Sequence, residues 1–482
     1  MSFVPISDYA PDIDPTTPGV LTDVSDYIPT LKGYAAAFSS TTSGLAALSA
    51  AAIGGAICQL LSGSYRVFSG TPAGLFEAAT TTWTDVSKGG GYTSTADDRW
   101  VFAQFGDTTL AANQTDTLQY STATGAFADV SGAPKATVVE TVPGFVMLGG
   151  TNEGTYGDQR DRWWCSAFND FTDWTPAVST QCTTGRLISA PGPITAVKRF
   201  GNDVVYYKER AMFYGRYVGA PDGFDFTLID SNAGTPAPDS VINIGNYHVF
   251  VGYDDFYLYD GTRPVPIGDK HKETFFNDLN KVYRYKITGA FDRQNDLCIW
   301  FYPSGASTTC DKAITYNIKN GKWGKLGRGA EAAIEYLTGQ VTYANISNFF
   351  ASYTAIDLPY DSPFWSQSSP VFAYFNSSHV LQLFTGTPGS CYFTTGDMGV
   401  DDNFSMLSRV RPRFSTAPSS ATMTNYYKNT SGATATTDQT VSMVSGKFDV
   451  LRSSRWHSVK VTTVGACETS GLDIQAIPEG QE

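Results

Sequence analysis

Short apolar runs separated by turn residues are the first regular pattern along this chain. Nearly continuous apolar runs occur at 99–103, 145–148, 203–207, 248–251 and 297–301. An apolar run of this length, bounded by turn signals, is typical of a strand that is buried on both faces. Asp260-Gly261 and Asn320-Gly321 lie between alternating segments. They predict tight hairpins, because both residues of a type I′ turn need a positive φ.

An aromatic anchor recurs at regular intervals. The residues Trp-Thr-Asp-Val-Ser at 83–87 return as Phe-Ala-Asp-Val-Ser at 127–131, a spacing of 44, and related segments start 47 and then 50 positions further on. A period of about 40–50 residues made of short strands is typical of β-propeller blades. We expect the blade-anchor aromatics to pack between blades in the core. These anchors are Trp83, Phe127, Trp174, Phe224 and Trp323.

Six repeat units match well and a seventh is weaker. The six units lie at 54–90, 97–133, 142–180, 194–230, 241–268 and 286–328, and the weaker one lies at 367–400. From residue 405 onward, segments of period two alternate with Ser/Thr/Gly loops, which predicts a small antiparallel sheet or sandwich. The sequence therefore predicts an all-β protein, with a β-propeller of six or seven blades at 45–404 and a C-terminal antiparallel β-domain at 405–482.

Residues 1–44 have a different composition, with prolines that keep the chain extended and aspartates that keep it solvated. We interpret them as an extended assembly arm that lies on another surface, such as a neighbouring subunit. A disordered tail is the alternative. The candidate contact residues of this arm are Asp12, Asp14, Pro15 and Pro18. Asp12 and Asp14 could also chelate a hard cation, but a solvated acidic segment is the simpler interpretation.

Composition narrows the classes of function. The chain has 33 basic and 46 acidic residues and a net charge of −13, whereas a general DNA binder needs a basic footprint. The seven cysteines contain no Cys-x-x-Cys pair, which argues against a zinc site and a disulfide framework. The most apolar segment, residues 45–61, is rich in Ala, Gly and Ser. We interpret it as a buried strand or short helix and expect no membrane insertion.

Catalytic motifs are absent from the sequence. No two of the four histidines lie within six residues of each other, and no nucleophile elbow or phosphate-binding loop occurs. His248 lies inside an apolar run, which favours a structural histidine. We therefore expect no enzyme activity, no cofactor and no metal site.

Two clusters of acids and arginines beside tryptophan are the candidate binding chemistry. They lie at 97–100 (Asp-Asp-Arg-Trp) and at 158–164 (Asp-Gln-Arg-Asp-Arg-Trp-Trp). An acid–arginine pair of this kind can clamp a carbohydrate, although a bridge between two blades is the simpler interpretation. The hairpins that end at Phe127 and Trp323 partly match the repeated box of sialidase-type propellers, but they lack its aspartate. A glycan-binding or glycan-cleaving propeller is thus the alternative function.

Two segments at opposite ends of the chain carry a resemblance to a known family. The N-terminal signature comprises residues 12–20 (Asp-Ile-Asp-Pro-Thr-Thr-Pro-Gly-Val) and 27–34, and the C-terminal signature comprises residues 452–461 (Arg-Ser-Ser-Arg-Trp-His-Ser-Val-Lys-Val) and 471–474. Together with the aromatic blades, these signatures resemble the tail hub, or nozzle, proteins of short-tailed bacteriophages, also called packaged-DNA stabilisation proteins. One position departs from the family pattern: about ten residues after His457, where the family has an aromatic residue, this sequence has Cys467.

This resemblance implies a structural virion protein that is assembled in the host cytoplasm and resides in the virion tail. It implies a homo-hexamer that forms a ring beneath the tail adaptor protein and extends the channel through which DNA leaves. Tail fibre or needle proteins are the further partners that it implies. DNA is expected to pass through the channel without specific binding.

Overall fold

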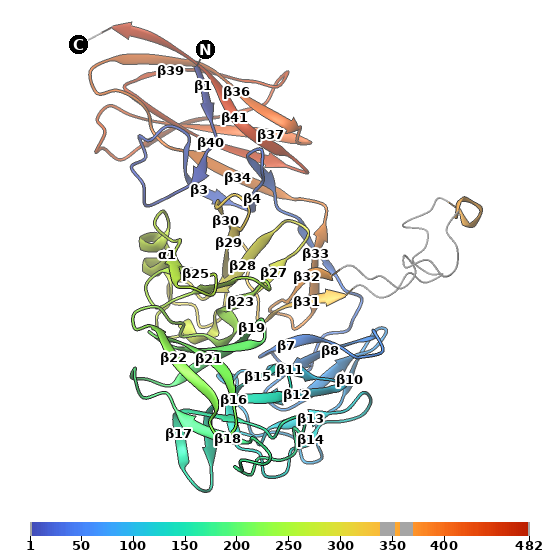
Figure 1. The fold of residues 1–482 in the computed structure, drawn as a ribbon. Helices are drawn as coiled ribbons and strands as arrows, with labels where there is room; N and C mark the ends of the chain where they lie inside the picture. The colour runs from blue at the N-terminus through green and yellow to red at the C-terminus, as the bar shows by residue number, and fades with distance from the viewer. Residues whose placement is uncertain (1, 338–351, 357–369, 481–482) are drawn as a thin grey trace.

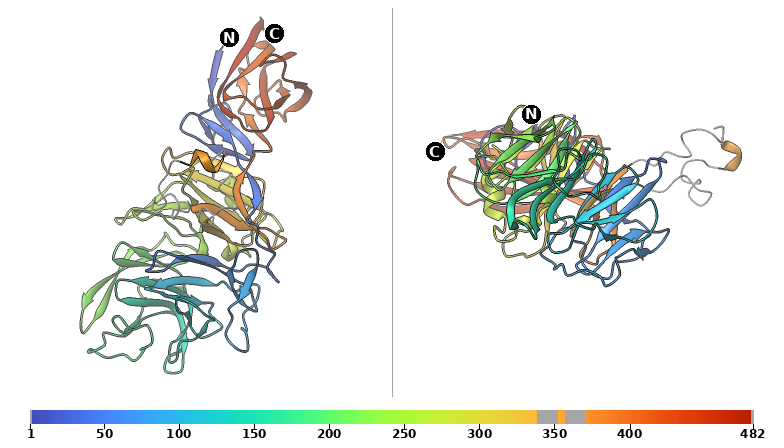
Figure 2. Two further views of the ribbon diagram at one scale, coloured as in Figure 1. Left: turned by 90° about the vertical axis from the view of Figure 1, so that its right-hand side faces the viewer. Right: turned by 60° about the horizontal axis from the view of Figure 1, so that its bottom comes forward.

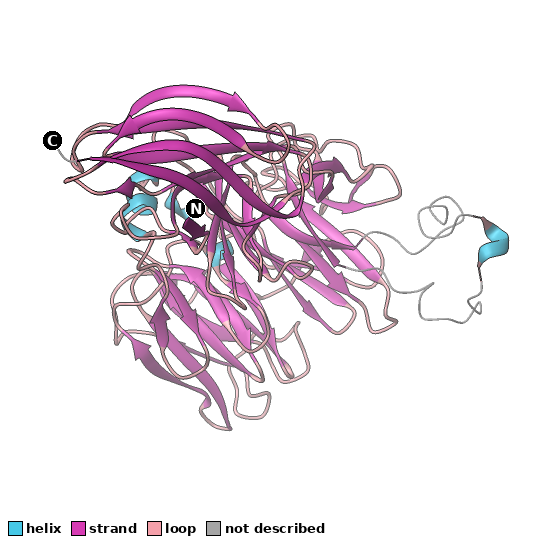
Figure 3. Ribbon diagram, turned by 90° about the horizontal axis from the view of Figure 1, so that it is seen from above, coloured by secondary structure: helices cyan, strands magenta, loops and turns pink. Residues whose placement is uncertain are grey.

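The computed structural model describes residues 2–337, 352–356 and 370–480, and its regular structure is almost entirely β-strand (Figures 1 and 3). Helical segments within these ranges are the short helix α1 (Lys272–Asp278) and the 3₁₀ turns η1 (Pro238–Ser240), η2 (Arg284–Lys286) and η4 (Tyr353–Ala355). In the same ranges, no helix is long and apolar enough to cross a membrane.

Seven four-stranded units make up the propeller in the described part of the chain. Blade 1 consists of β7 (Gly55–Gln59), β8 (Tyr65–Gly70), β9 (Leu75–Ala78) and β10 (Trp83–Asp85). Blade 2 consists of β11 (Val101–Phe105), β12 (Thr108–Ala112), β13 (Gln119–Ser121) and β14 (Ala128–Asp129). Blade 3 consists of β15 (Lys135–Val142), β16 (Phe145–Glu153), β17 (Gly157–Cys165) and β18 (Thr183–Arg186). Blade 4 consists of β19 (Ile194–Phe200), β20 (Asp203–Lys208), β21 (Met212–Gly219) and β22 (Gly223–Asp230). Blade 5 consists of β23 (Ile242–Asn243), β24 (His248–Val251), β25 (Phe256–Tyr259) and β26 (Pro264–Pro266). Blade 6 consists of β27 (Thr288–Asp292), β28 (Leu297–Tyr302), β29 (Lys312–Asn317) and β30 (Trp323–Leu326). Blade 7 consists of β31 (Ala333–Leu337), β32 (Pro370–Phe375), β33 (Leu381–Gly386) and β6 (Ser39–Thr42).

The innermost strands of the blades form a closed ring. They contact one another in the order β7, β11, β15, β19, β23, β27 and β31, and β31 then contacts β7. Blade 7 takes its outermost strand, β6, from the beginning of the chain, where Thr42 pairs with Gln382 of β33. Strand β6, which precedes blade 1 in the sequence, thus completes blade 7, whose other three strands follow blade 6. The predicted β-propeller of six or seven blades is confirmed.

The C-terminal β-domain is built from both ends of the chain and lies at one end of the molecule (Figures 1 and 2). Its strands are β34 (Ser390–Thr395), β35 (Met398–Gly399), β36 (Phe404–Thr416), β37 (Ser420–Lys428), β38 (Thr436–Ser442), β39 (Phe448–Ser454), β40 (Trp456–Val464) and β41 (Glu468–Gly480), joined by β1 (Ser2–Pro5), β2 (Asp8–Tyr9), β3 (Val20–Ser25), β4 (Tyr27–Pro29) and β5 (Tyr34–Ala36). One sheet has the order β2-β3-β34-β40-β37-β38. The other runs β5-β41-β36-β39 and continues through β4 into blade 6.

The N-terminal segment is extended, as expected, but it is built into the sheets of its own chain. Its strands pair within the chain: β1 with β41, β3 with β34, and β4 with β30. The prolines that favour a solvated arm stand in turns or at strand ends. Between them, the apolar residues of β3 and β4 are buried, and burying that surface stabilises the pairing. The interpretation of residues 1–44 as an arm resting on a neighbour is therefore corrected.

Other predicted boundaries also shift. The weak unit at 367–400 divides, because β32 and β33 belong to blade 7 whereas β34 belongs to the C-terminal β-domain; residues 367–369 lie outside the described ranges. Four of the five apolar runs form second strands, and only the run at 99–103 contributes to an innermost strand. The apolar segment 45–61 forms no helix and contains β7. Gly54 precedes this strand, and a Cβ there would lie 2.2 Å from the Trp100 carbonyl oxygen.

Candidate functional site

Four of the five anchor aromatics pack onto a ring of the preceding blade. The pairs and their ring-centroid distances are Trp83–Phe375 (5.7 Å), Phe127–Phe68 (5.3 Å), Phe224–Phe145 (5.3 Å) and Trp323–Phe256 (4.7 Å). The fifth, Trp174, lies in the connection between β17 and β18, where its indole N–H donates to the Phe171 carbonyl oxygen at 2.9 Å. All are buried except Trp83, which is partly exposed. Four of the five anchor rings therefore pack between neighbouring blades, whereas the hydrogen bond of Trp174 is made within its own connection.

The candidate arm residues are held by their own chain. The Asp12 carboxylate accepts the backbone N–H groups of Glu273 (2.7 Å) and Thr274 (2.9 Å) in the first turn of α1. Asp14 accepts the N–H of Thr16 at 2.9 Å, which lowers the pKa of its carboxyl group. Asp12 and Asp14 therefore have separate structural partners. In the described ranges, no three His, Cys, Asp or Glu side chains are grouped to hold a metal ion.

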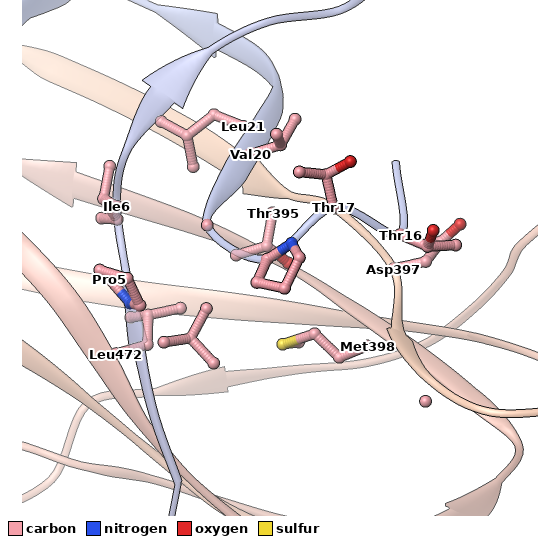
Figure 4. A pocket seen from close by; sticks show the side chains of 15 residues that line it. Pro5, Ile6, Thr16, Thr17, Val20, Leu21, Thr395, Asp397, Met398 and Leu472 are labelled. Carbon is pink, nitrogen blue, oxygen red and sulfur yellow. The ribbon is translucent and has the colours of Figure 1, made fainter. Parts of the chain in front are cut away.

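The turn that contains Pro15 and Pro18 lies against the C-terminal β-domain. The Pro15 carbonyl oxygen accepts the Asp397 N–H at 2.7 Å. Pro18 lines a cavity of about 240 Å³ between this turn, β1 and the segment around Met398 (Figure 4). Pro5, Ile6, Leu21 and Leu472 supply most of its apolar wall. No titratable side chain other than Asp397 lines the cavity, so it suits packing better than chemistry.

A buried polar cluster attaches the N-terminal segment to blade 6. The Tyr34 hydroxyl lies 2.7 Å from the Trp323 carbonyl oxygen and 3.1 Å from Asp8 Oδ1, and it accepts the Tyr9 N–H at 2.7 Å. Asp8 also pairs with Lys270 at 2.8 Å. Burial, followed by the nearby Asp8 carboxylate, raises the pKa of Tyr34. The hydroxyl therefore stays protonated and keeps these hydrogen bonds.

The two acid–arginine clusters meet at one mouth of the propeller's central channel. A pocket of about 380 Å³ opens there, between segments that adjoin the innermost strands of several blades. Its polar lining residues are Asp97, Asp98, Arg99, Asn113, Gln114, Thr137, Arg160, Thr195 and Tyr285, and its apolar wall is Pro193, Ile194, Pro236 and Pro238. The tryptophans of both clusters are buried in the blades and do not line the pocket.

The charged groups of this pocket differ in how they are paired. Asp97 accepts a hydrogen bond from the Tyr285 hydroxyl at 2.8 Å and forms an ion pair with Lys286 at 2.9 Å. Asp97 precedes blade 2, and Tyr285 and Lys286 precede blade 6, so these contacts bridge the two segments. Lys286 and then Tyr285 lower the pKa of Asp97. Arg160 pairs with Asp158 of its own blade at 2.6 Å. Arg99, in contrast, forms no ion pair with any described residue, and its buried Nε has no hydrogen-bond acceptor among them.

The channel below the mouth carries one further pair of charges. A hollow of about 120 Å³ is lined by Lys198 of β19, Asp239 of η1 and the glycines Gly54, Gly55 and Gly289. Burial raises the pKa of Asp239, while the nearby charges of Lys198 and then Arg99 act in the opposite direction. Sequence reasoning singled out Arg99 and Arg160 but not Tyr285, Gln114 or Asp239. No local signal identifies those three, because they meet only when the ring closes.

His248 is a satisfied structural residue. Its Nε2 lies 3.0 Å from the Arg199 carbonyl oxygen and therefore carries the proton, and its Nδ1 accepts the Tyr207 hydroxyl at 2.6 Å. Burial lowers the pKa of His248 to about 4. The imidazole is thus neutral at physiological pH and has no free nitrogen for acid–base chemistry.

The strand pairing of the described residues defines a seven-bladed β-propeller with an appended β-domain. No protein-family model and no curated protein matches the chain. Among solved structures, it is similar to YCF48 bound to D1 peptide, with 11% identity, 76% of this chain and 99% of that chain covered, and a TM-score of 0.37. It is also similar to the Pan2 WD40 domain of Neurospora crassa (6% identity, 69% and 97% covered, TM-score 0.38) and to the computationally designed Ika8 protein (11% identity, 71% and 98% covered, TM-score 0.34).

Proposed function

We propose that this protein is a structural component of a short virion tail, where its copies form a homo-hexameric ring as a hub or nozzle. One observation carries the proposal. The two signatures that resemble the nozzle family stand at opposite ends of the sequence, yet they share one hydrophobic core, in which Tyr34 of the first lies with Val459 and Leu472 of the second. Tyr34 also pairs with Thr469, two positions before the segment 471–474. Two distant segments that fold into one unit support their interpretation as a single family feature.

The ring docks beneath the tail adaptor protein and extends the DNA exit channel, and tail fibre or needle proteins attach to it. The charge of the chain supports passage of DNA without binding. With 46 acidic and 33 basic residues, the protein lacks the surplus of cations needed to release phosphate counterions. A wall of this charge leaves the moving DNA unbound. The proposal assigns the protein to the virion tail and gives it no enzymatic step.

The experiment is to locate the protein in particles from the phage that encodes it. An affinity tag on the exposed β38–β39 side of the C-terminal β-domain, followed by antibody labelling and electron microscopy, should mark the tail and no other part of the particle. Mass spectrometry of gradient-purified particles should find the intact chain as a stoichiometric component. Its absence from purified particles would contradict the proposal, and so would labelling confined to the capsid.

A glycan-binding or glycan-cleaving propeller is the second candidate, because the channel mouth gathers both acid–arginine clusters in one pocket. The corresponding test is to incubate the purified protein with polysaccharide from the host surface and to measure both retention and release of reducing ends. Retention or cleavage by the isolated chain would favour this candidate. Neither should occur if the protein acts only as a tail ring.

A further inference from the structure

The channel mouth contains a charged group that the protein itself leaves without a partner. A guanidinium has five N–H donors, and buried donors are nearly always satisfied. Arg99 lines the pocket, yet it has no acceptor for its buried Nε and no ion pair within 4.0 Å among the described residues. An arginine in this state calls for an acceptor from outside the chain. We propose that the channel mouth binds a small carboxylate-bearing ligand through Arg99.

The local charge favours a monoanion. Asp97 and Asp98 line the same pocket as Arg99, Asp239 lines the hollow below it, and the charge of Arg99 favours the ionised form of both Asp97 and Asp239. A phosphate dianion at the mouth would meet Asp97 and Asp98 with Arg99 as the cation there that has no ion pair, since Lys198 lies beside Asp239 in the hollow below. A carboxylate carries one charge, and its two oxygens match the planar fork of a guanidinium. The pocket therefore selects carboxylates over phosphates.

The remaining lining suits a ligand of about the size of one sugar ring. The pocket volume of about 380 Å³ lies at the lower end of the usual range for small-molecule sites. Pro193, Pro236 and Pro238 form a rigid apolar wall. Gln114 offers an amide on the polar side, and Asp98 offers its Oδ1 to ligand hydroxyl groups, because its Oδ2 already accepts the N–H and the hydroxyl of Thr95. A hexuronate and an N-acylated neutral amino acid share the single carboxylate that Arg99 would bind, so the test must separate these two sources.

The site deepens the second candidate function but does not depend on ring formation, since all of its residues come from one chain. The full-length protein is titrated calorimetrically at fixed salt with sodium glucuronate, N-acetylglutamine, glucose and inorganic phosphate. Glucuronate should bind saturably, and glucose and phosphate at least about tenfold more weakly, as expected for the loss or mismatch of a charge-assisted pair. If N-acetylglutamine, which also carries one carboxylate, binds more tightly than glucuronate, the carboxylate comes from an amino-acid derivative and the site still stands.

Arg99→Met should abolish the binding of both carboxylates, and Arg99→Lys should weaken it, because an ammonium keeps the charge but loses the fork. Arg186→Met is the matched control, since Arg186 is paired with Asp161 outside the pocket. Without ligand, Arg99→Met should melt at the same temperature as the parent protein or higher, because it removes a buried Nε–H group that lacks an acceptor. Equal binding of glucose, no saturable binding of either carboxylate, or unchanged binding by Arg99→Met would each overturn the inference.

Discussion

The hydroxyl of Tyr27 lies 2.7 Å from the hydroxyl of Thr469, so a hydrogen bond joins residues that are 442 positions apart. Tyr27 belongs to β4 and Thr469 to β41, and both are buried. Strand β5 lies between them in the sheet. The bond therefore closes the junction at which both chain ends meet blade 6. It also joins the N-terminal signature, through Tyr27, to the strand that contains residues 471–474 of the C-terminal signature.

Removing the Tyr27 hydroxyl tests this junction. Tyr27→Phe keeps the ring in place but leaves the buried Thr469 hydroxyl without its partner, which should lower the free energy of unfolding by about 1–3 kcal/mol. Tyr65→Phe is the control, since Tyr65 is 44% exposed and should change stability little. Chemical denaturation followed by tryptophan fluorescence measures both. Equal effects of the two substitutions would show that the junction bond adds nothing.

The anchor aromatics should differ in their contribution to stability according to burial. Trp323 is 1% exposed and stacks against several rings, so Trp323→Ala should cost about 3–5 kcal/mol. Trp83→Ala should cost less, because Trp83 is only partly buried. Melting temperatures of the two variants provide the comparison. A larger loss at Trp83 would contradict the assignment of Trp323 to the core of the blade 5–blade 6 interface.

Two N-terminal deletions should have different effects. Deleting residues 1–30 removes β1–β4, which deprives β34 and β41 of partners but leaves every blade with four strands. The C-terminal β-domain should then become sensitive to protease while the propeller resists it. Deleting residues 1–44 also removes β6, so blade 7 loses its outer strand and the propeller itself should become sensitive. Limited proteolysis with mass analysis separates these outcomes. Identical digestion patterns for both deletions would refute the role of β6 in ring closure.

His248 should make stability depend on pH. Its folded-state pKa of about 4 lies below the ordinary value of 6.5, so the unfolded chain binds more protons between these values. Stability contributed by the neutral imidazole is complete above pH 6.5 and is lost as the pH falls toward 4, by up to about 3 kcal/mol. The free energy of unfolding of the parent protein should therefore fall more steeply over this range than that of His248→Gln. Parallel pH profiles would contradict the buried neutral histidine.

Local sequence signals predict the blades well because each blade is a local meander. The unit at 194–230 coincides with blade 4, which spans Ile194 to Asp230. The turn glycines Gly261 and Gly321 have φ values of +95° and +68°, but Asp260 and Asn320 do not have a positive φ. The predicted type I′ turns are therefore wrong, and the connections span residues 260–263 and 318–322. The strand pairings of the N-terminal segment were not predictable in this way. Thr42 pairs with Gln382, and Tyr34 pairs with Thr469. No periodicity specifies a partner more than 300 positions away.

The same limit applies to the channel-mouth pocket. The likeness of residues 97–100 and 158–164 was visible in the sequence, but their meeting at one mouth follows from ring closure. Their simpler interpretation, a bridge between blades, holds for Asp97, which reaches Lys286. It fails for Arg160, which pairs with Asp158 within blade 3. Whether an arginine has a partner depends on the three-dimensional environment, so the unpaired state of Arg99 appears only in the structure.

The most direct test of the proposed tail ring is a native mass measurement of the full-length protein, alone and mixed with the tail adaptor protein of the same phage. The proposed function predicts a closed oligomer of six chains, formed by the protein alone or together with the adaptor. It predicts no open assembly that keeps growing by the addition of further chains. A single-chain mass under both conditions, across the full range of concentration, would contradict it.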